Sequence, residues 1–129
     1  PNLLQDFNVI ENIMLPLRYR GTNSQKSRNI AIECLDEANL LEHQDSPVSI
    51  LSGGEAQRVG IARAIAMKSK IIFADEPTGN LDSVNSQSVI NKLTEICETH
   101  MITLIVVSHD DDVIHKMKTK KKMLEGKVI

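Results

Sequence analysis

The stretch of sequence that decides the fold is Leu51-Ser52-Gly53-Gly54-Glu55-Ala56-Gln57-Arg58. A serine and two glycines stand here before a run that favours helix, so we expect a helix to begin at this point. The unpaired backbone amides of such a helix start suit a phosphate, and glycines let a ligand approach the backbone closely. A second interpretation remains open, because the Ser-x-x-Glu spacing of Ser52 and Glu55 is also that of a capping box, which would only start the helix.

Composition excludes several classes of function. The 129 residues are 41% hydrophobic and 25% charged, which is typical of a soluble globular protein of one domain. A formal net charge of −2 and 2% aromatic residues argue against a nucleic-acid partner, for which basic patches and stacking side chains are needed. No apolar run reaches the length of a membrane span, and the first residues do not resemble a signal peptide.

Cysteine usage points to a reducing compartment. Cys34 and Cys97 stand far apart, and neither has a second ligand at metal-binding spacing. We therefore predict that both are reduced and structural in a cytosolic protein. The chain begins with Pro1 rather than methionine, so we expect it to begin in the middle of a larger protein.

The first half of the chain is predicted to be mostly helical. Apolar residues at 9–15 predict a short helix that Pro16 ends. A second helix is expected from about residue 25 to 39, with Asn23 or Ser24 as its cap. Its apolar positions recur at helical spacing and predict one buried stripe: Ile30, Cys34, Leu35 and Ala38.

The second half predicts parallel strands. Residues 71–74 and 103–107 are continuous apolar runs of the kind found in strands buried on both faces. A helix is expected between them, from about 83 to 98, and strand–helix–strand order predicts parallel pairing through a right-handed crossover. After a short helix, a hairpin is expected to turn near Gly126.

Polar side chains follow both predicted strands, and ligands bind beyond the carboxyl ends of parallel strands. Asp75 and Glu76 come directly after the first strand, and His109 follows the second. Asp75 would hold Mg²⁺ through a coordinated water, while Glu76 would polarise the water that attacks a terminal phosphate. His109 can donate a hydrogen bond to a phosphate oxygen or to that water. Taken singly, each of the three could be merely solvated; taken together with the opening stretch, they favour phosphate chemistry.

Four motifs resemble those of ATP-binding-cassette (ABC) ATPases. Leu51–Arg58 looks like the family's signature motif, and Ile71–Glu76 resembles its Walker B strand with the catalytic glutamate. Asn80-Leu81-Asp82 resembles the D-loop, and His109 the switch histidine. The resemblance covers residues 51–110 and implies an α/β fold: a P-loop NTPase-like core of parallel strands flanked by helices, with a helical subdomain.

Two further stretches resemble the lipoprotein-releasing and macrolide-exporter group within that family. Residues 75–82 read Asp-Glu-Pro-Thr-Gly-Asn-Leu-Asp, as in this group, and residues 2–17 are similar to the segment after the Q-loop. No Gly-x-x-x-x-Gly-Lys-Ser/Thr loop occurs in the 129 residues. The resemblance therefore implies a helical subdomain at 1–67, including the signature helix, and the C-terminal half of the RecA-like ATPase core at 68–129, with the Walker A portion absent.

The resemblance also implies partners and cofactors. ATP and Mg²⁺ would lie between two ATPase subunits paired head to tail. Asp75, Glu76 and His109 would serve the nucleotide of their own subunit. The residues that contact ATP across the dimer interface would be Ser52, Gly53, Gly54, Glu55 and Asp82. Residues 1 to about 50 would face a transmembrane permease subunit, which places the protein in the cytoplasm, peripheral on the inner face of the cell membrane. We expect the complete protein to hydrolyse ATP and the 129 residues alone to be inactive.

Two alternatives and two local questions stay open. The complete protein could instead be a soluble ABC ATPase of DNA repair or translation, or a non-catalytic domain that uses the fold only to dimerise. Residues 48–50 carry one residue more than is usual before the signature, which leaves the entry to its helix open. Met101 stands where a helix-ending glycine is common, which leaves the form of the turn before the second strand open.

Overall fold

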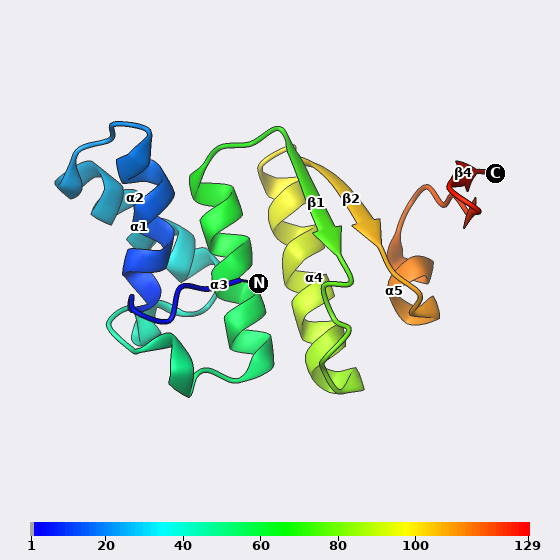
Figure 1. Cartoon of the computed structure of the whole chain (residues 1–129), viewed down its shortest axis with the longest axis horizontal. Coiled ribbons are helices and arrows are strands. Elements are labelled where there is room, and N and C mark those ends of the chain that lie inside the picture. The colour runs from blue at the N-terminus through cyan, green and yellow to red at the C-terminus, as the bar shows by residue number, and fades with distance from the viewer. Residues whose placement is uncertain (1) are drawn as a thin grey trace.

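The fold is known from a computed structural model, which describes residues 2–129. In Figure 1 the helices of residues 9–66 lie at one end, the helix of residues 83–99 lies beside the paired strands of residues 71–75 and 103–107, and a small hairpin lies at the far end. The α-helices are α1 (Val9–Tyr19), α2 (Ser24–Glu37), α3 (Gly53–Ala66), α4 (Ser83–Thr99) and α5 (Asp111–Lys116). Two 3₁₀ turns, η1 (Leu41–His43) and η2 (Val48–Ile50), link α2 to α3. The strands are β1 (Ile71–Asp75), β2 (Thr103–Val107), β3 (Met123–Leu124) and β4 (Lys127–Val128).

One apolar core joins the helices. The helices α1, α2 and α3 pack against one another, and α3 also packs against α4. Residues of all four helices are fully buried in a single cluster that extends to Ile72 of β1. The largest buried side chains include Ile10, Ile13, Leu35, Leu40, Leu93 and Ile90. Among residues 2–129, no helix is long and apolar enough to cross a membrane.

Helix α1 continues through Pro16, so the prediction that this proline ends the helix was wrong. Proline in a helix interior removes one backbone hydrogen bond and costs about 3 kcal/mol. The next residue, Leu17, is 6% exposed in the core, and the backbone N–H of Arg20 donates to the Pro16 carbonyl at 3.2 Å. Burial of the last turn and its continuing hydrogen bonds therefore offset the cost of the proline.

The predicted helix α2 and its cap are confirmed; of the predicted buried stripe, Cys34, Leu35 and Ala38 are buried and Ile30 is partly buried. Asn23 caps α2 by accepting a hydrogen bond from the Lys26 N–H at 2.8 Å. Cys34 and Cys97 are both free and buried. Burial, together with the nearby carboxylates of Glu37 and Glu33, raises the pKa of the Cys34 thiol to about 11. A thiol of this kind is unreactive, in keeping with a structural role.

Strands β1 and β2 pair in parallel, as predicted, with Phe73 opposite Ile105 and Asp75 opposite Val107. The prediction that both strands are buried on both faces was wrong. Ile72 is 8% exposed, whereas Phe73 on the opposite face is 74% exposed. The cause is that the described residues supply helices to one face of this two-stranded sheet only. The apolar residues of the other face, which we call the open sheet face, are Ile71, Phe73, Ile105 and Val107.

Two turns show how backbone conformation is fixed around the strands. The predicted hairpin is confirmed: β3 and β4 pair antiparallel around Glu125 and Gly126, which have φ angles of 48° and 77°. Two successive positive φ angles are typical of the tight turns that suit a twisted hairpin. Met101 adopts φ 55°, so the turn keeps the left-handed geometry of a helix-ending glycine although no glycine is present.

Replacement of Met101 by glycine should therefore stabilise the protein. A non-glycine residue in the left-handed region costs about 1 kcal/mol, and the Met101 side chain, at 91% exposed, makes little packing that could be lost. Glycine also gains entropy in the unfolded chain, so the net rise in the free energy of unfolding should stay below about 1 kcal/mol. Urea denaturation of Met101→Gly would measure it. The matched Met101→Ala variant keeps the strain and should be unchanged; an equal gain from alanine would contradict the explanation.

Candidate functional site

A capping box closes the start of α3, as the spacing of Ser52 and Glu55 allowed. The Ser52 N–H and hydroxyl both donate to the Glu55 Oε2 at 2.8 Å, and the Glu55 N–H donates to the Ser52 Oγ at 3.3 Å. The hydrogen bonds from Ser52 are the main cause of a lowered pKa of the Glu55 carboxyl, and nearby positive charge lowers it further. The cap does not exclude a ligand, since a capped helix start still presents several free amides.

Residues 48–50, which lead into the signature stretch, form the 3₁₀ turn η2. Pro47 precedes this turn, and the Leu51 N–H donates to the Val48 carbonyl at 3.3 Å. Val48 is buried at 6% exposed, while Ile50 points outward at 65% exposed. The turn therefore has one buried and one exposed apolar side chain, and the helix after it begins at Gly53 with an intact cap.

The two glycines of the stretch differ in what surrounds them. A Cβ atom at Gly53 would lie 2.8 Å from the Leu81 Cδ2, which is closer than carbon atoms approach, whereas one at Gly54 would meet only Asn85 at 3.5 Å. Gly53 therefore makes room for a side chain of the same chain. The contact joins the start of α3 to the loop before α4, and both helices begin at the same end of the molecule (Figure 1).

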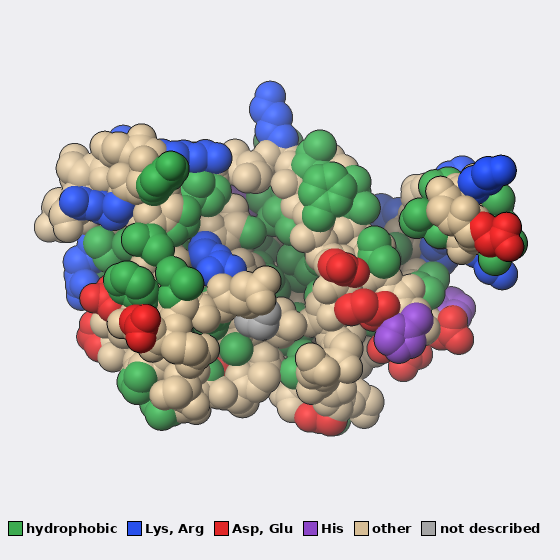
Figure 2. Space-filling view, viewed as in Figure 1, with side chains coloured by type: hydrophobic (Ala, Val, Ile, Leu, Met, Phe, Trp, Pro, Cys, Tyr) green, Lys and Arg blue, Asp and Glu red, His purple; other side chains and the backbone are tan. Residues whose placement is uncertain are grey.

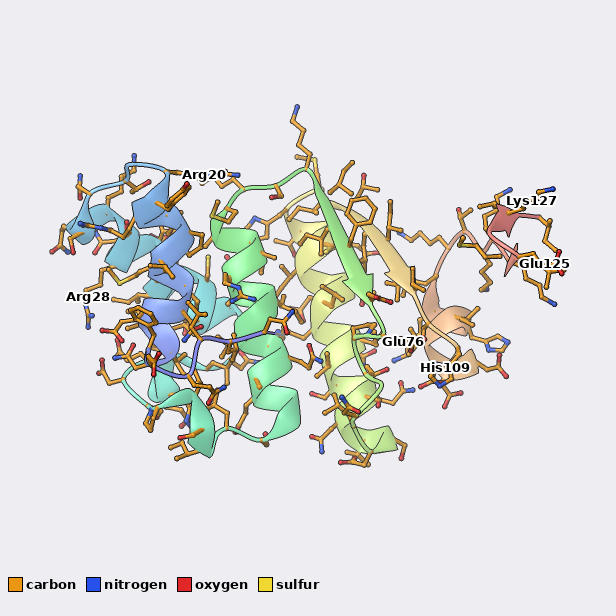
Figure 3. The ribbon with its side chains drawn as sticks, in the orientation of Figure 1. Arg20, Arg28, Glu76, His109, Glu125 and Lys127 are labelled. Carbon is orange, nitrogen blue, oxygen red and sulfur yellow. The ribbon has the colours of Figure 1, made fainter. Side chains whose placement is uncertain are left out.

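Glu76 and His109 are in direct contact where β1 and β2 end (Figure 3). The His109 Nδ1 lies 2.7 Å from the Glu76 Oε1, and the backbone N–H of His109 donates to the same oxygen at 3.1 Å. The Ser108 hydroxyl donates to the other carboxylate oxygen at 3.4 Å. The hydrogen bond and the negative charge of Glu76 raise the pKa of His109, whose side chain is 83% exposed.

The backbone of Glu76 brings this contact about. The Glu76 N–H donates to the Val107 carbonyl at 2.8 Å, which extends the β1–β2 pairing by one residue. Glu76 then turns at φ 44°, a left-handed conformation that is uncommon outside glycine and asparagine. Residues held in this region cluster at functional sites, where surrounding contacts maintain them.

The two aspartates of the predicted site are held differently. Asp75 ends β1 opposite Val107, and its carboxylate has no hydrogen-bond or ion-pair partner among residues 2–129. Asp82 is the N-cap of α4: its Oδ1 accepts hydrogen bonds from the N–H groups of Val84 and Asn85 at 3.0 Å each. Hydrogen bonds from the Asn85 backbone and side chain, with that from Val84, lower the pKa of the Asp82 carboxyl.

The described residues contain no group of three His, Cys, Asp or Glu side chains that could hold a metal ion by themselves. This arrangement suits Mg²⁺ only in the mode in which one or two carboxylates bind it together with water and substrate phosphates. The carboxylate of Asp75 fits that mode, because it is exposed at the strand end and has no hydrogen bond or ion pair with residues 2–129.

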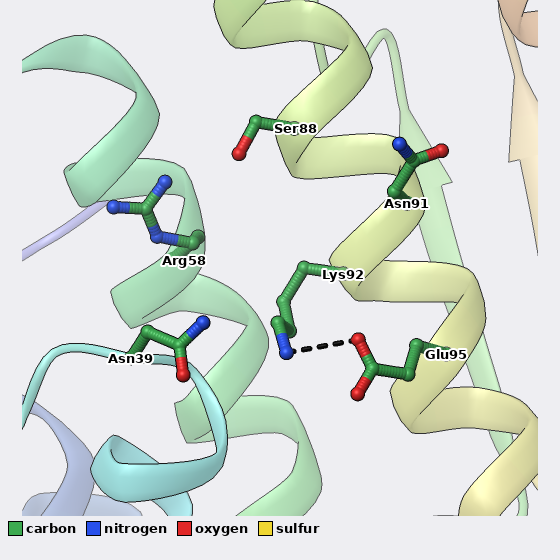
Figure 4. Close-up of a pocket in the computed structure, with 6 residues that line it drawn as sticks. All are labelled: Asn39, Arg58, Ser88, Asn91, Lys92 and Glu95. Atoms are coloured by element: carbon green, nitrogen blue, oxygen red, sulfur yellow. Dashed lines mark ion pairs between the residues drawn. The ribbon is translucent and has the colours of Figure 1, made fainter.

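Two hollows lie elsewhere on the surface. One, of about 380 Å³, lies between α3 and α4 and is lined by polar side chains, among which Lys92 and Glu95 form an ion pair at 2.9 Å (Figure 4). The other, of about 540 Å³, is the N-terminal groove, whose lining includes Leu4, Leu15, Pro16, Tyr19, Arg20 and Met67. Buried Asn12 fixes one wall, since it accepts from the Leu4 N–H at 2.8 Å and donates to the Leu4 carbonyl at 3.1 Å.

The structure brings the predicted residues into two groups. Asp75, Glu76 and His109 gather at the strand ends, where Figure 2 shows acidic side chains beside a histidine. The signature residues gather with the loop before α4 through the contact of Gly53 with Leu81. Sequence reasoning missed two neighbours: Ser108, which adjoins His109 in the chain, and His43, which lies 3.4 Å from Glu55 across a loop. Only Ser108 carried a local signal, its place at a strand end.

Comparison with known proteins agrees with this geometry. The strands, helices and strand-end site define part of an ABC ATPase (P-loop NTPase) fold. A family model described as "ABC transporter" matches residues 1–79. The chain belongs to the ABC transporter family.

Several curated relatives align with nearly the whole of this chain. It is 41% identical over 127 residues to the lipoprotein-releasing system ATP-binding protein LolD of Leptospira interrogans, covering 98% of this chain and 53% of that protein. It is 40% identical to the macrolide export ATP-binding/permease protein MacB of Syntrophobacter fumaroxidans, covering 97% of this chain and 18% of that protein. The chain therefore spans about half the length of the LolD relatives that it matches.

A solved structure confirms the fold. The dimeric ATP-binding cassette MJ0796, bound to ADP and Pi in a post-hydrolysis state, matches with a TM-score of 0.71 at 36% identity. The match covers 87% of this chain and 50% of that chain. The prediction of an ABC ATPase fold is thus confirmed, and so is the predicted resemblance to this family.

The contact between Glu76 and His109 predicts a pH dependence. Because the folded protein raises the pKa of His109, the ion pair stabilises the fold at pH values below the unfolded pKa of histidine, about 6.5. That contribution is lost as the pH rises through the folded pKa. An NMR titration of His109 should give a pKa above 6.5 in the wild type and a lower one in Glu76→Gln. Glu98→Gln, which removes a carboxylate paired with Lys118, is the control and should leave the titration unchanged.

Proposed function

We propose that the complete protein is the ATP-hydrolysing subunit of an ABC transporter of the lipoprotein-release or macrolide-export type. The observation that carries the proposal is the contact between Glu76 and His109 at the carboxyl ends of β1 and β2. Membership of the ABC transporter family and the similarity to LolD and MacB proteins support it. Within this proposal, residues 1–67 form the helical subdomain and residues 68–129 the C-terminal half of the ATPase core.

Glu76 is the proposed general base. A carboxylate can polarise an attacking water and accept its proton, and the His109 Nδ1 holds this carboxylate in place, 2.7 Å from the Glu76 Oε1. The second oxygen of Glu76 has one longer hydrogen bond, at 3.4 Å from the Ser108 hydroxyl, and is the better placed to accept a proton from water. His109 orients the base, and its other ring nitrogen is left to donate toward a phosphate oxygen.

ATP with Mg²⁺ is the proposed substrate, and Asp75 would hold the ion through a coordinated water. Mg²⁺ neutralises charge on the phosphates when it is bound. Asp75 is suited to this role because it adjoins Glu76 at the end of β1 and has no competing partner among the described residues. The MJ0796 cassette, which is bound to ADP and Pi, supports nucleotide binding by a protein of this fold.

The start of α3 is proposed to bind the terminal phosphate of a nucleotide held by a second subunit. The residues that would act across that interface are Ser52, Gly53, Gly54, Glu55 and Asp82. Ser52, Gly53 and Asp82 are all exposed on one end of the molecule, where a partner can reach them. Leu81 links the two parts of this surface through its contact with Gly53. The dimeric state of the MJ0796 cassette supports a paired arrangement.

The open sheet face supports the proposal that this chain is one part of a larger ATPase. Four apolar side chains lie uncovered on two adjacent strands, and one of them, Phe73, is 74% exposed. Apolar faces of this kind are normally covered, because their exposure costs about 25 cal/mol for each Å² left in water. The LolD relatives are about twice as long as this chain, and the additional residues of such a protein would cover the face.

The N-terminal groove is the proposed contact for a transmembrane permease subunit. Its exposed apolar side chains are Leu4, Leu15 and Tyr19, and Tyr19 is 94% exposed. The floor belongs to α1 and α3, so pressure on the groove would reach the signature stretch through the packing of these two helices. The protein would then lie in the cytoplasm on the inner face of the cell membrane.

Replacement of Glu76 by glutamine in the complete protein should nearly abolish Mg-ATP hydrolysis while nucleotide binding persists. Glutamine keeps the shape but cannot accept the proton, and loss of a general base lowers turnover by about 10²–10⁴-fold. Phosphate release and fluorescent-nucleotide binding would measure the two effects, with Glu125→Gln in the exposed hairpin as the control. Wild-type turnover in Glu76→Gln would contradict the proposal.

The 129 residues alone should bind ATP weakly and should not hydrolyse it, because they contain no phosphate-binding Gly-x-x-x-x-Gly-Lys-Ser/Thr loop. Isothermal titration and a phosphate-release assay on the purified chain would test this. Robust Mg-dependent turnover by these residues would contradict the prediction that hydrolysis needs this loop.

A charged residue in the N-terminal groove should weaken binding of the permease. Tyr19→Asp places an unpaired charge in an apolar contact and should lower affinity at least tenfold, without change in the basal ATPase rate of the complete protein. Co-purification with the membrane subunit and its stimulation of turnover would measure this. Met101→Asp changes an equally exposed apolar residue outside the groove and should have no effect.

A further inference from the structure

His43 lies against the signature helix although it stands outside the signature stretch in the sequence. It ends the 3₁₀ turn η1, and its Nε2 is 3.4 Å from the Glu55 Oε1. Both side chains are only 27% exposed. A second carboxylate, that of Glu42, lies 3.9 Å from the same nitrogen, but its side chain is 83% exposed. Glu55 is therefore the better shielded partner of His43.

The two oxygens of the Glu55 carboxylate have different partners. Oε2 accepts both hydrogen bonds from Ser52, at 2.8 Å each, and thereby closes the helix cap. Oε1 takes no part in the cap and faces His43. The carboxylate is thus held from two sides, by its own helix and by η1. The pKa of Glu55 is lowered by the Ser52 hydrogen bonds and by the charges of His43 and Arg58, so the carboxylate is ionised at neutral pH.

The segment that carries His43 is itself firmly attached. The His43 N–H donates to the Leu40 carbonyl at 2.9 Å, and Leu40 is 1% exposed in the core. Just beyond His43, the Gln44 and Ser46 carbonyls accept hydrogen bonds from the first turn of α1 at 2.9 and 3.0 Å. His43 therefore holds Glu55 from a segment tied to both the core and α1.

We propose that His43 is a positioning residue for the phosphate site at the start of α3. By holding the Oε1 of Glu55, it fixes the carboxylate that closes the cap and so keeps the backbone amides of Gly53 and Gly54 aligned toward a nucleotide on the partner subunit. This inference rests on the proposed function. His43 is not itself in contact with the phosphate, and it lies outside the motif from which the site was predicted.

The test is a comparison of ATP KM and kcat in the complete protein. His43→Leu removes the ring nitrogen that faces the Glu55 Oε1 and should raise the KM about threefold, the fold-change expected of a partly exposed polar contact, with kcat nearly unchanged. The conservative His43→Gln keeps an N–H donor and should restore part of the affinity. In a Glu55→Gln background, His43→Leu should have no further effect, because the partner charge is already gone. Glu42→Gln is the matched control and should leave the KM unchanged.

The outcomes separate this inference from the proposed function. Absence of Mg-ATP turnover in the complete wild-type protein overturns both. Wild-type turnover together with an unchanged KM in His43→Leu overturns the positioning role alone, and so does an equal KM rise in the Glu55→Gln background. Urea denaturation establishes that each variant folds. Should His43→Leu fail to fold, the smaller His43→Ala substitution gives the same comparison with the same expected threefold rise.

Discussion

The parallel pairing of β1 with β2 is the constraint on which the candidate site depends. Its register sets Asp75 opposite Val107, and the next residue, Glu76, donates its N–H to the Val107 carbonyl. A shift of one residue in this pairing would send the Glu76 side chain to the other face of the sheet and away from His109. The contact between Glu76 and His109 therefore depends on the β1–β2 register. The packing of the covered sheet face against α4 fixes that register.

At the helical end of the molecule, side-chain contacts hold the helix starts in place. Helices α1 and α3 both begin with a capping box, formed by Asn8 with Glu11 and by Ser52 with Glu55. Only the second has a histidine against the free oxygen of its glutamate. The same local device thus serves as an ordinary cap at α1, whereas at α3 tertiary contacts add a restraint where a ligand is proposed to bind.

Two surfaces of this chain leave apolar side chains uncovered. The open sheet face lies opposite the helices, and the N-terminal groove lies between α1, α3 and the first residues. The two surfaces differ in what they expose: the sheet presents a flat apolar layer typical of an interior, and the groove mixes apolar side chains with arginines. In the proposed function, the rest of the same protein covers the first and a separate subunit contacts the second.

The sequence by itself determined the family and the order of the elements and predicted the residues of the candidate site, because these follow from local spacing: the signature stretch, the acids after one apolar run and the histidine after another. It could not decide what covers each face of the sheet, since a continuous apolar run is the same whether one or both faces are packed. It also misplaced the end of α1, where burial of Leu17 outweighs the local cost of Pro16. Only the tertiary structure decided the contacts of Glu76 with His109 and of Glu55 with His43, because each joins residues that are distant in the chain and close only after packing.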